Sequence, residues 1–232
     1  MKRSELKSRA KQKLSGNWKW AIGVVAIVWI IQICLQMNSI HDILTTKELL
    51  THHNGLITDV HFTFYASPLV QTGGLVLGLI AASTILGFLH FSDNRKDENV
   101  LTSVFAGFTE GRIWAFILTW ILQYIFTLLW TLLLIIPGII KAYSYAMSIY
   151  IVDDLKRQGK NLSATEAITR SKHLMKGHKW ELFVLDLSFL GWWFLATLTL
   201  GIGYLWLYPY ILTTRAEFYR CLIAQNPTVL AD

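Results

Sequence analysis

The sequence predicts an all-α polytopic membrane protein with six transmembrane helices, arranged as three hairpins that are each preceded by a short amphipathic cytoplasmic helix. Three observations lead to this fold class: the composition, long apolar runs, and basic residues that flank those runs. Of the 232 residues, 53% are hydrophobic and only 16% are charged, whereas soluble domains have about 45–50% apolar and about 25% charged residues. We therefore expect a single membrane domain.

Four apolar runs are long enough to cross a bilayer as helices. A crossing needs roughly 20 predominantly apolar residues, with a range of about 17–25. The four runs are residues 20–37, 69–91, 113–136 and 182–200. We expect each of them to be one transmembrane helix.

Two shorter apolar runs, 139–152 and 204–214, follow residues that break helices. The first comes after Pro137 and Gly138, and the second after Gly201 and Gly203. A helix of about 14 residues reaches only about 21 Å, less than the roughly 30 Å apolar core of a bilayer. Length alone leaves these two crossings open.

Basic residues decide between the possible topologies. Residues 1–19 and 153–181 each contain seven Lys or Arg, and loops of this kind face the cytoplasm. Both segments are cytoplasmic only if the short runs cross as well. The sequence thus predicts six spans, cytoplasmic termini, and tight outer turns at Pro137-Gly138 and around Gly201 and Gly203. The net charge of +6 is then a topology signal, and we expect no nucleic-acid partner.

The entrance to each hairpin has a similar sequence, with a glycine shortly before a tryptophan: LSGNWKWAI at 14–22, TEGRIWAF at 109–116 and LMKGHKWELF at 174–183. Trp favours the membrane–water interface, so these residues are predicted to anchor the inner boundary: Trp18, Trp20, Trp114 and Trp180. The predicted units are residues 1–91, 97–152 and 163–216. They are either an internal repeat or a convergent use of generic membrane features.

A short amphipathic helix is expected before each entrance, because apolar residues recur at helical spacing. Ser163 and Glu166 also have the spacing of a capping box at the start of the third such helix. The apolar stripes are Leu6, Ala10 and Leu14; Val100, Val104 and Phe108; and Ala164, Ile168, Ser171 and Met175.

Three segments carry a resemblance to a known family: LKSRAKQKLSGNWKWAI, IIPGIIKAYSYAMSIYIVDD, and LMKGHKWELFVLDLSFLGWW with the later LTLGIGYLWLYPY. Over nearly its whole length the chain resembles an uncharacterised family of bacterial integral-membrane proteins, domain of unknown function 975. It is also distantly similar to the membrane region of glycerophosphodiester phosphodiesterases. The resemblance implies a multi-pass cell-membrane protein, and it implies no activity, substrate or catalytic residue.

Asp186 is the most distinctive polar residue within a predicted span. A carboxylate there costs about 2.5–3.5 kcal/mol on insertion scales and marks a functional site by default. Counted from the turn around Gly201 and Gly203, Asp186 and Arg215 fall at a similar depth in two antiparallel helices. We expect an ion pair, which either locks the third hairpin or forms a polar site for a lipid headgroup or an ion.

Basic side chains near both membrane boundaries have a simpler interpretation. Lys141 follows the outer turn and is expected to extend toward the outer headgroups, with contact to an anionic outer-leaflet ligand as the alternative. Basic residues of the N-terminal segment would attract anionic inner-leaflet lipids at roughly 1 kcal/mol per charge. They include Lys7, Arg9, Lys11 and Lys13.

The sequence predicts no cofactor and no bound metal. The 38–68 loop contains possible ligands for zinc or copper without a recognised spacing, and we expect a solvated loop. Its histidines are His41, His52, His53 and His61. The two cysteines, Cys34 and Cys221, are expected to be free thiols.

No motif of a known enzyme class occurs in the sequence, neither GxSxG nor HExxH nor GxxxxGK[ST]. We therefore expect a non-catalytic multi-pass plasma-membrane protein that binds a membrane-protein partner or scaffolds envelope machinery. The alternative is a lipid- or small-solute-handling, permease-like protein that uses an intramembrane polar site at Asp186 and Arg215. A membrane-embedded enzyme would need two acid–base groups at one depth, and only Asp186 and His90 offer such groups.

Overall fold

The computed structural model describes residues 2–34, 68–95, 99–108, 113–133, 135–160 and 163–230. These residues form helices and no strands, so the predicted all-α class is confirmed for the described part of the chain. The predicted 38–68 loop with its histidines, and Gly111, lie outside the described residues.

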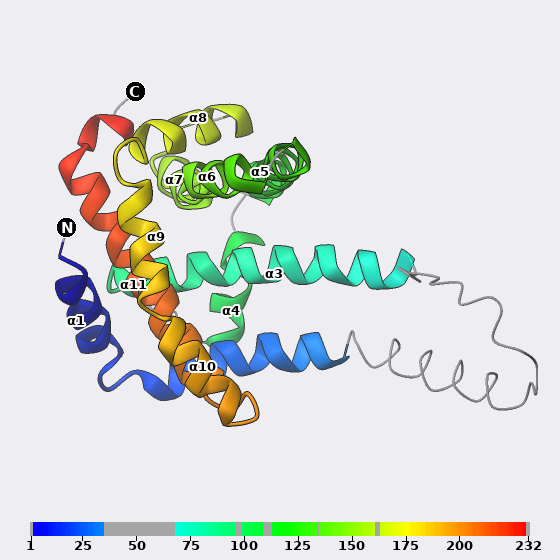
Figure 1. Ribbon diagram of the computed structural model, residues 1–232, viewed down its shortest axis with the longest axis vertical. Helices are drawn as coiled ribbons and strands as arrows, with labels where there is room; N and C mark the ends of the chain where they lie inside the picture. The colour runs from blue at the N-terminus through cyan, green and yellow to red at the C-terminus, as the bar shows by residue number, and fades with distance from the viewer. Residues whose placement is uncertain are drawn as a thin grey trace, which may run out of the picture.

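Short helices alternate with long hairpins along the chain (Figure 1). Helix α1 (Arg3–Leu14) precedes the first hairpin, which consists of the helix Trp18–Cys34 and α3 (Pro68–Ser92). The short α4 (Val100–Val104) and η1 (Ala106–Phe108) precede the second, formed by α5 (Ile113–Leu133), α6 (Ile135–Tyr145) and α7 (Ser148–Arg157). Helix α8 (Ala164–Leu174) precedes the third, formed by α9 (Lys179–Leu187), α10 (Leu190–Leu198) and α11 (Tyr204–Gln225), and the short helix η2 (Pro227–Leu230) follows α11.

The first and third short helices bury their predicted apolar stripes, whereas in the second stripe Val104 is buried and Val100 and Phe108 are half-buried. In α1, Leu6, Ala10 and Leu14 are at most 3% exposed. Helix α8 begins as its capping sequence predicts, because the Ser163 hydroxyl oxygen accepts the backbone N–H of Glu166 at 3.2 Å. The predicted 100–108 helix is interrupted, since α4 ends at Val104 and a 3₁₀ turn follows.

Glycines reverse the chain after two of these helices. Gly16 has a φ of +81° after α1, and Gly177 has a φ of +86° after α8. This left-handed conformation strains residues that carry a Cβ. It explains why a glycine occurs at this point before two of the hairpins.

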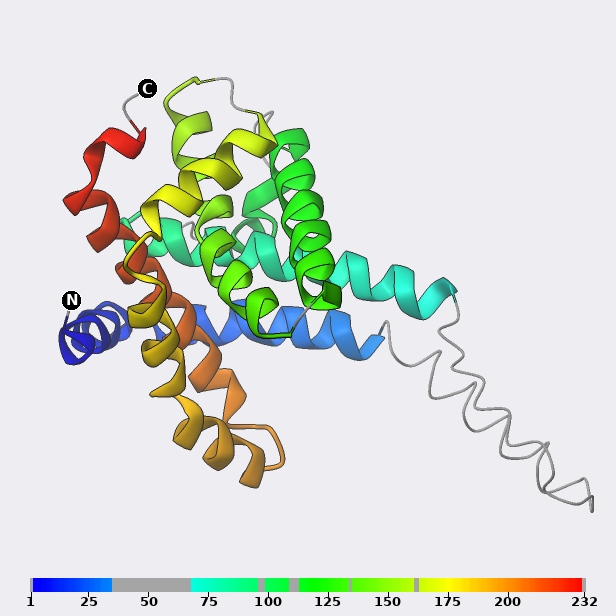
Figure 2. The ribbon, with the colours of Figure 1, turned by 45° about the horizontal axis from the view of Figure 1, so that its top comes forward.

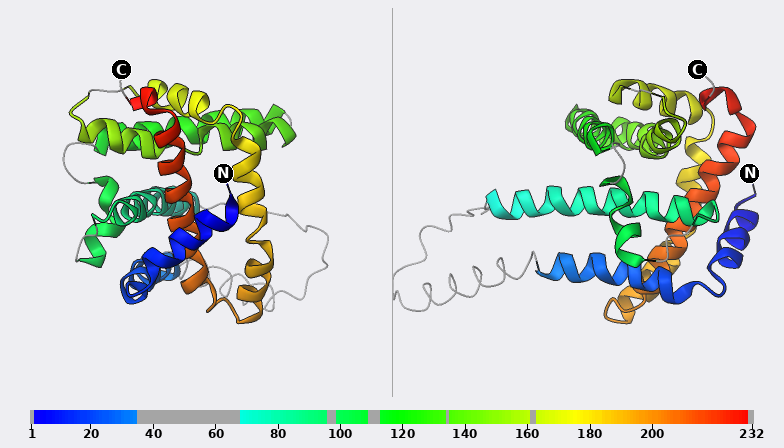
Figure 3. Two further views of the ribbon diagram at one scale, coloured as in Figure 1. Left: turned by 90° about the vertical axis from the view of Figure 1, so that its left-hand side faces the viewer. Right: turned by 180° about the vertical axis from the view of Figure 1, so that it is seen from behind.

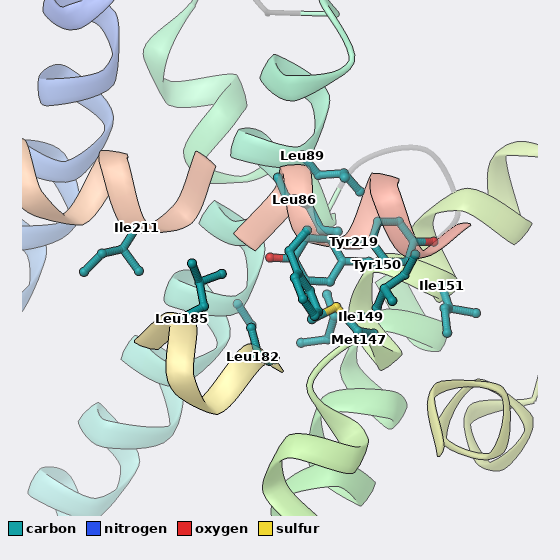
Figure 4. Close-up of a cluster of buried hydrophobic side chains, with 14 of the residues drawn as sticks. Leu86, Leu89, Met147, Ile149, Tyr150, Ile151, Leu182, Leu185, Ile211 and Tyr219 are labelled. Carbon is teal, nitrogen blue, oxygen red and sulfur yellow. The ribbon is translucent and has the colours of Figure 1, made fainter. Parts of the chain in front are cut away.

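The three hairpins meet in one hydrophobic core. Figure 4 shows Leu86 and Leu89 of α3, Ile149 and Tyr150 of α7, and Leu182 and Leu185 of α9 gathered around Tyr219 of α11. The rings of Tyr150 and Tyr219 stack with their centroids 4.9 Å apart. This core is the junction from which the hairpins extend.

The hairpins leave the junction in three different directions. In Figure 1 the first lies across the view, the second is seen almost end-on and the third runs obliquely downward. The two other orientations in Figure 3 show the same divergence, and Figure 2 shows α5 and α6 side by side in the second hairpin. The described helices therefore do not form a bundle of parallel spans.

Two helical stretches, Ile113–Trp130 and Lys179–Leu198, are long and apolar enough to cross a membrane. A third crossing is reached if Arg3–Leu14 and Trp18–Cys34, which are bent by 95° to each other, count as one broken span. Val76–Ser92 is apolar but shorter. The described structure thus supports two or three spans, fewer than the six that the sequence predicts.

The structure does not place Pro137 and Gly138 in the turn of the second hairpin, where the sequence predicts an outer turn. Helix α5 ends at Leu133 and α6 begins at Ile135, so Pro137 and Gly138 lie in the first turn of α6. A proline fits there because the first N–H groups of a helix have no partner within the helix. Gly201, with a φ of +90°, and Gly203 do lie in the turn between α10 and α11.

Candidate functional site

The ends of α3, α7 and α11 bring together charged residues that are far apart in the sequence. We call this group the charged cluster. It holds four carboxylates and four cations, together with three polar side chains. The members are Asp93, Asp153, Asp154 and Glu217; Lys13, Arg95, Arg157 and Arg220; and His90, Ser92 and Tyr219.

Arg220 joins all three helix ends. Its guanidinium donates to both carboxylate oxygens of Asp154, at 2.5 and 2.9 Å, and to Asp93 Oδ2 at 2.5 Å. The hydroxyl of Tyr219 also donates to Asp154, at 2.7 Å. The Asp154 side chain is only 8% exposed, so these bonds replace its hydration.

Asp153 sits in a second group beside the first. It accepts from Arg157 Nε at 2.8 Å and lies 2.9 Å from His90 Nε2, and Arg157 also contacts the His90 ring. The Asp153 side chain is 1% exposed and that of His90 is 7% exposed. The pairing ties the end of α3 to α7.

Glu217 forms a third group with the N-terminal helix. Its carboxylate lies 2.6 Å from Lys13 Nζ and accepts the hydroxyl of Ser92, whose backbone oxygen accepts from Lys13 as well. Lys13 thus connects α1 to α3 and α11.

The electrostatic environment favours the protonation states in which Arg220 and Tyr219 donate these hydrogen bonds. Burial alone lowers the pKa of the Arg220 guanidinium, but its hydrogen bonds to Asp154 and Asp93 outweigh burial and raise that pKa above its ordinary value. Burial and the neighbouring Asp154 charge raise the pKa of Tyr219. Arg220 therefore stays charged, and Tyr219 keeps the proton that it donates.

Sequence reasoning missed this cluster. Arg157 counts only as one of the basic residues of 153–181 that predict a cytoplasmic segment, and the topology rule gives little weight to acidic residues such as Asp153, Asp154 and Glu217. A signal was present, because an acidic residue follows each second helical run, in FSD at 91–93, IVDD at 151–154 and RAEF at 215–218.

The predicted contact between Asp186 and Arg215 is present. Arg215 donates to the two oxygens of Asp186 at 3.1 and 2.7 Å, in the bidentate geometry of strong ion pairs. The hydroxyl of Tyr143 in α6 donates to Asp186 at 3.1 Å. The pair is open on one side, since the Arg215 side chain is 39% exposed.

A cavity of about 440 Å³ lies beside this pair, between the second and third hairpins. Its polar lining comes from Gln123, Tyr143 and Arg215. The Oε1 atom of Gln123 is buried and has no hydrogen-bond partner among the described residues. A buried acceptor without a donor is costly, so Gln123 is an unsatisfied polar group in the wall of this cavity.

Other predicted residues have less specific surroundings. The Lys141 ammonium in α6 lies 4.4 Å from the centre of the Trp130 ring in α5. Trp114 and Trp180 are 73% and 70% exposed, as interface anchors would be, and Trp18 is half-buried. Trp20 does not face outward, because it is 8% exposed and stacks on Phe91 at 4.8 Å.

Two of the N-terminal basic residues, Lys7 and Arg9, form contacts within the protein. The Lys7 ammonium donates to the backbone oxygen of Ser188 at 3.2 Å and lies 4.1 Å from the centre of the Phe189 ring. These two residues form the break between α9 and α10, so Lys7 binds a carbonyl that the helix leaves unpaired. Arg9 pairs with Glu5 at 2.7 Å, and Lys11 is exposed.

Among the residues described, no group of three or more His, Cys, Asp or Glu is arranged to hold a metal ion. Cys34 and Cys221 are free thiols, as the sequence predicts.

Comparison with known proteins gives one match. A family model described as a protein of unknown function (DUF975) matches residues 1–158 and, in an overlapping second match, residues 131–226. No curated protein and no solved structure matches the chain. The matched ranges contain the whole charged cluster and the Asp186–Arg215 pair, and the chain belongs to this DUF975 family.

Proposed function

We propose that the chain is a non-catalytic multi-pass protein of the plasma membrane, which scaffolds envelope machinery or binds a membrane-protein partner. The charged cluster carries this proposal. Each of its four carboxylates is held by a cation, so these groups serve to hold helix ends together and are not available as general bases.

The apolar surface of the hairpins supports the same proposal. Large exposed apolar areas on a protein mark contact with a membrane or another protein. Helix α5 exposes one such face and α10 another. The exposed side chains include Trp114, Leu118, Leu128 and Leu129 in α5, and Leu190, Trp192, Phe194 and Leu198 in α10.

We propose the six-span topology with both termini in the cytoplasm. It would bring the ends of α3, α7 and α11 to one side of the membrane, and their meeting in the charged cluster supports this. Six crossings also require the hairpins to turn toward a shared direction, because transmembrane helices tilt by about 0–40° from the bilayer normal.

Cysteine accessibility tests this topology. In a Cys34→Ser, Cys221→Ala background, Lys160→Cys should be labelled only from the cytoplasmic side. Leu50→Cys, in the predicted outer loop, should be labelled only from outside. Labelling of position 160 from outside would contradict six spans.

Photocrosslinking in living cells tests the scaffold role. A photoreactive amino acid at Leu118 or Leu129, which are 50% and 56% exposed on α5, should capture the same partner protein. Position Phe116 of the same helix is 1% exposed and should capture none. Adducts with lipid alone at both exposed positions would overturn the proposal.

The cavity beside Asp186 and Arg215 favours a second candidate, the handling of a lipid or small solute at this intramembrane pair, with Lys141 at the outer boundary. Native mass spectrometry of the gently extracted protein tests it. A stoichiometric lipid or solute that is lost in Asp186→Asn and kept in the control Glu181→Gln would favour this candidate. If Asp186→Asn retained the same bound lipids and solutes as the wild type, this second candidate would be excluded.

A further inference from the structure

A groove of about 400 Å³ opens where the N-terminal segment meets the third hairpin. Its size falls in the roughly 300–1,000 Å³ range of small-molecule sites. The walls are mostly aromatic and aliphatic, and Trp192, Leu195 and Trp206 are about half exposed. The residues that matter here are Lys11, Trp18, Trp192, Leu195, Trp206 and Tyr210.

Two hydroxyl groups along this groove form hydrogen bonds within the protein. The Thr199 hydroxyl donates to the Ala196 oxygen at 2.7 Å and accepts the Gly203 N–H at 2.8 Å. The Tyr210 hydroxyl donates to the Lys7 oxygen at 3.4 Å. Lys11 is the charged side chain among the described residues that line the groove. It forms no ion pair with the described part of the chain.

We propose that this groove binds one anionic phospholipid, with an acyl chain between Trp192 and Trp206 and the phosphate against the Lys11 ammonium. Apolar walls exclude water from an acyl chain, and basic pockets beside membrane helices bind anionic headgroups. The site is a single defined position, which differs from general attraction of the basic N-terminal segment to the inner leaflet. The proposal rests on the membrane location of the chain and is independent of the scaffold role.

A second copy of the chain fits the groove less well. In a two-fold dimer the same patch meets itself, and this would bring two α1 helices together. Each α1 contains five Lys or Arg and one Glu, so like charges would face each other across the interface. Charge complementarity therefore selects the anionic lipid.

Native mass spectrometry with defined lipids tests this proposal. The full-length protein is delipidated in neutral detergent and mixed with equal amounts of phosphatidylglycerol and phosphatidylcholine that carry the same acyl chains. The wild type should retain one phosphatidylglycerol per chain in preference to phosphatidylcholine. Lys11→Gln should reduce that preference about tenfold, and Lys19→Gln, at an exposed lysine outside the groove, should keep it.

Further variants separate the possible outcomes. Trp206→Leu should weaken retention of both lipids, because it removes an apolar wall. Melting temperatures of all variants near that of the wild type would show that each is folded. Equal retention in Lys11→Gln and Lys19→Gln, equal binding of the two lipids by the wild type, or a dimer that Trp206→Leu abolishes would each overturn the proposal.

Discussion

The ion pair between Asp154 and Arg220 can be removed by substituting either residue, and the two substitutions should differ in how much they destabilise the protein. Arg220→Gln leaves the Asp154 carboxylate, 8% exposed, with Tyr219 as its donor. Asp154→Asn leaves Arg220 with a second carboxylate, because Arg220 also donates to Asp93 at 2.5 Å. The arginine substitution should therefore be the more damaging of the two.

The structure sets the expected magnitudes. Removing one partner of a buried ion pair costs about 3–5 kcal/mol, which we assign to Arg220→Gln. In Asp154→Asn the amide oxygen still accepts one bond and Asp93 still neutralises Arg220, so the loss should be about 2–3 kcal/mol, as for one charged hydrogen bond. The double variant contains no stranded charge and should lose about 3–5 kcal/mol, less than the sum by about 2–3 kcal/mol.

The free energy of unfolding is measured by denaturing-detergent titration in mixed micelles, followed by circular dichroism. Arg9→Gln is the matched control, because Arg9 forms an exposed pair with Glu5 within one helix, and we expect little change there. Losses that add within about 0.5 kcal/mol, or a greater loss in Asp154→Asn than in Arg220→Gln, would refute the reasoning.

Three more predictions concern two glycines, the Asp186–Arg215 pair and the Cys221 thiol. Gly87→Ala should lose about 1–3 kcal/mol of unfolding free energy, since a Cβ there would overlap the Ser103 carbonyl oxygen. In the control Gly191→Ala the Cβ meets open space, so this variant should be neutral or more stable by up to about 1 kcal/mol. Equal losses in the two variants would contradict this prediction. Asp186→Asn and Arg215→Gln should be strongly non-additive in melting temperature, and simple additivity would mean that the pair contributes nothing. Burial raises the pKa of the Cys221 thiol, and the nearby Arg9 lowers it by a smaller amount. Alkylation of Cys221 should therefore be slow at pH 7 and faster at higher pH, and at equal pH it should be slower in Arg9→Gln than in the wild type. An alkylation rate that does not change with pH would argue against this.

Much of the local structure follows from the sequence. Stripes such as Leu6, Ala10 and Leu14 predict which face of a short helix is buried, because helical period fixes that face. The Asp186–Arg215 contact follows from counting equal distances on both sides of one turn. Both inferences use only neighbouring segments.

The charged cluster needed information that such counting lacks. Topology rules give weight to Lys and Arg and little to Asp and Glu, so Arg157 indicates only a membrane side, and its partner Asp153 has no weight. The directions of the hairpins are also set by packing between distant segments, as in the stack of Tyr150 on Tyr219. Neither follows from hydropathy, which treats each run by itself.

The packing of α1 against the third hairpin has a consequence for biosynthesis. Lys7 bonds to Ser188 and lies beside Tyr210, so its partners leave the ribosome about 180 to 200 residues later. Until then the Leu6–Leu14 stripe has no cover from α11, and the nascent chain must hold it against the membrane surface or a chaperone. Closure of the fold thus awaits synthesis of the third hairpin, and a chain cut after the second hairpin would expose this helix to proteolysis.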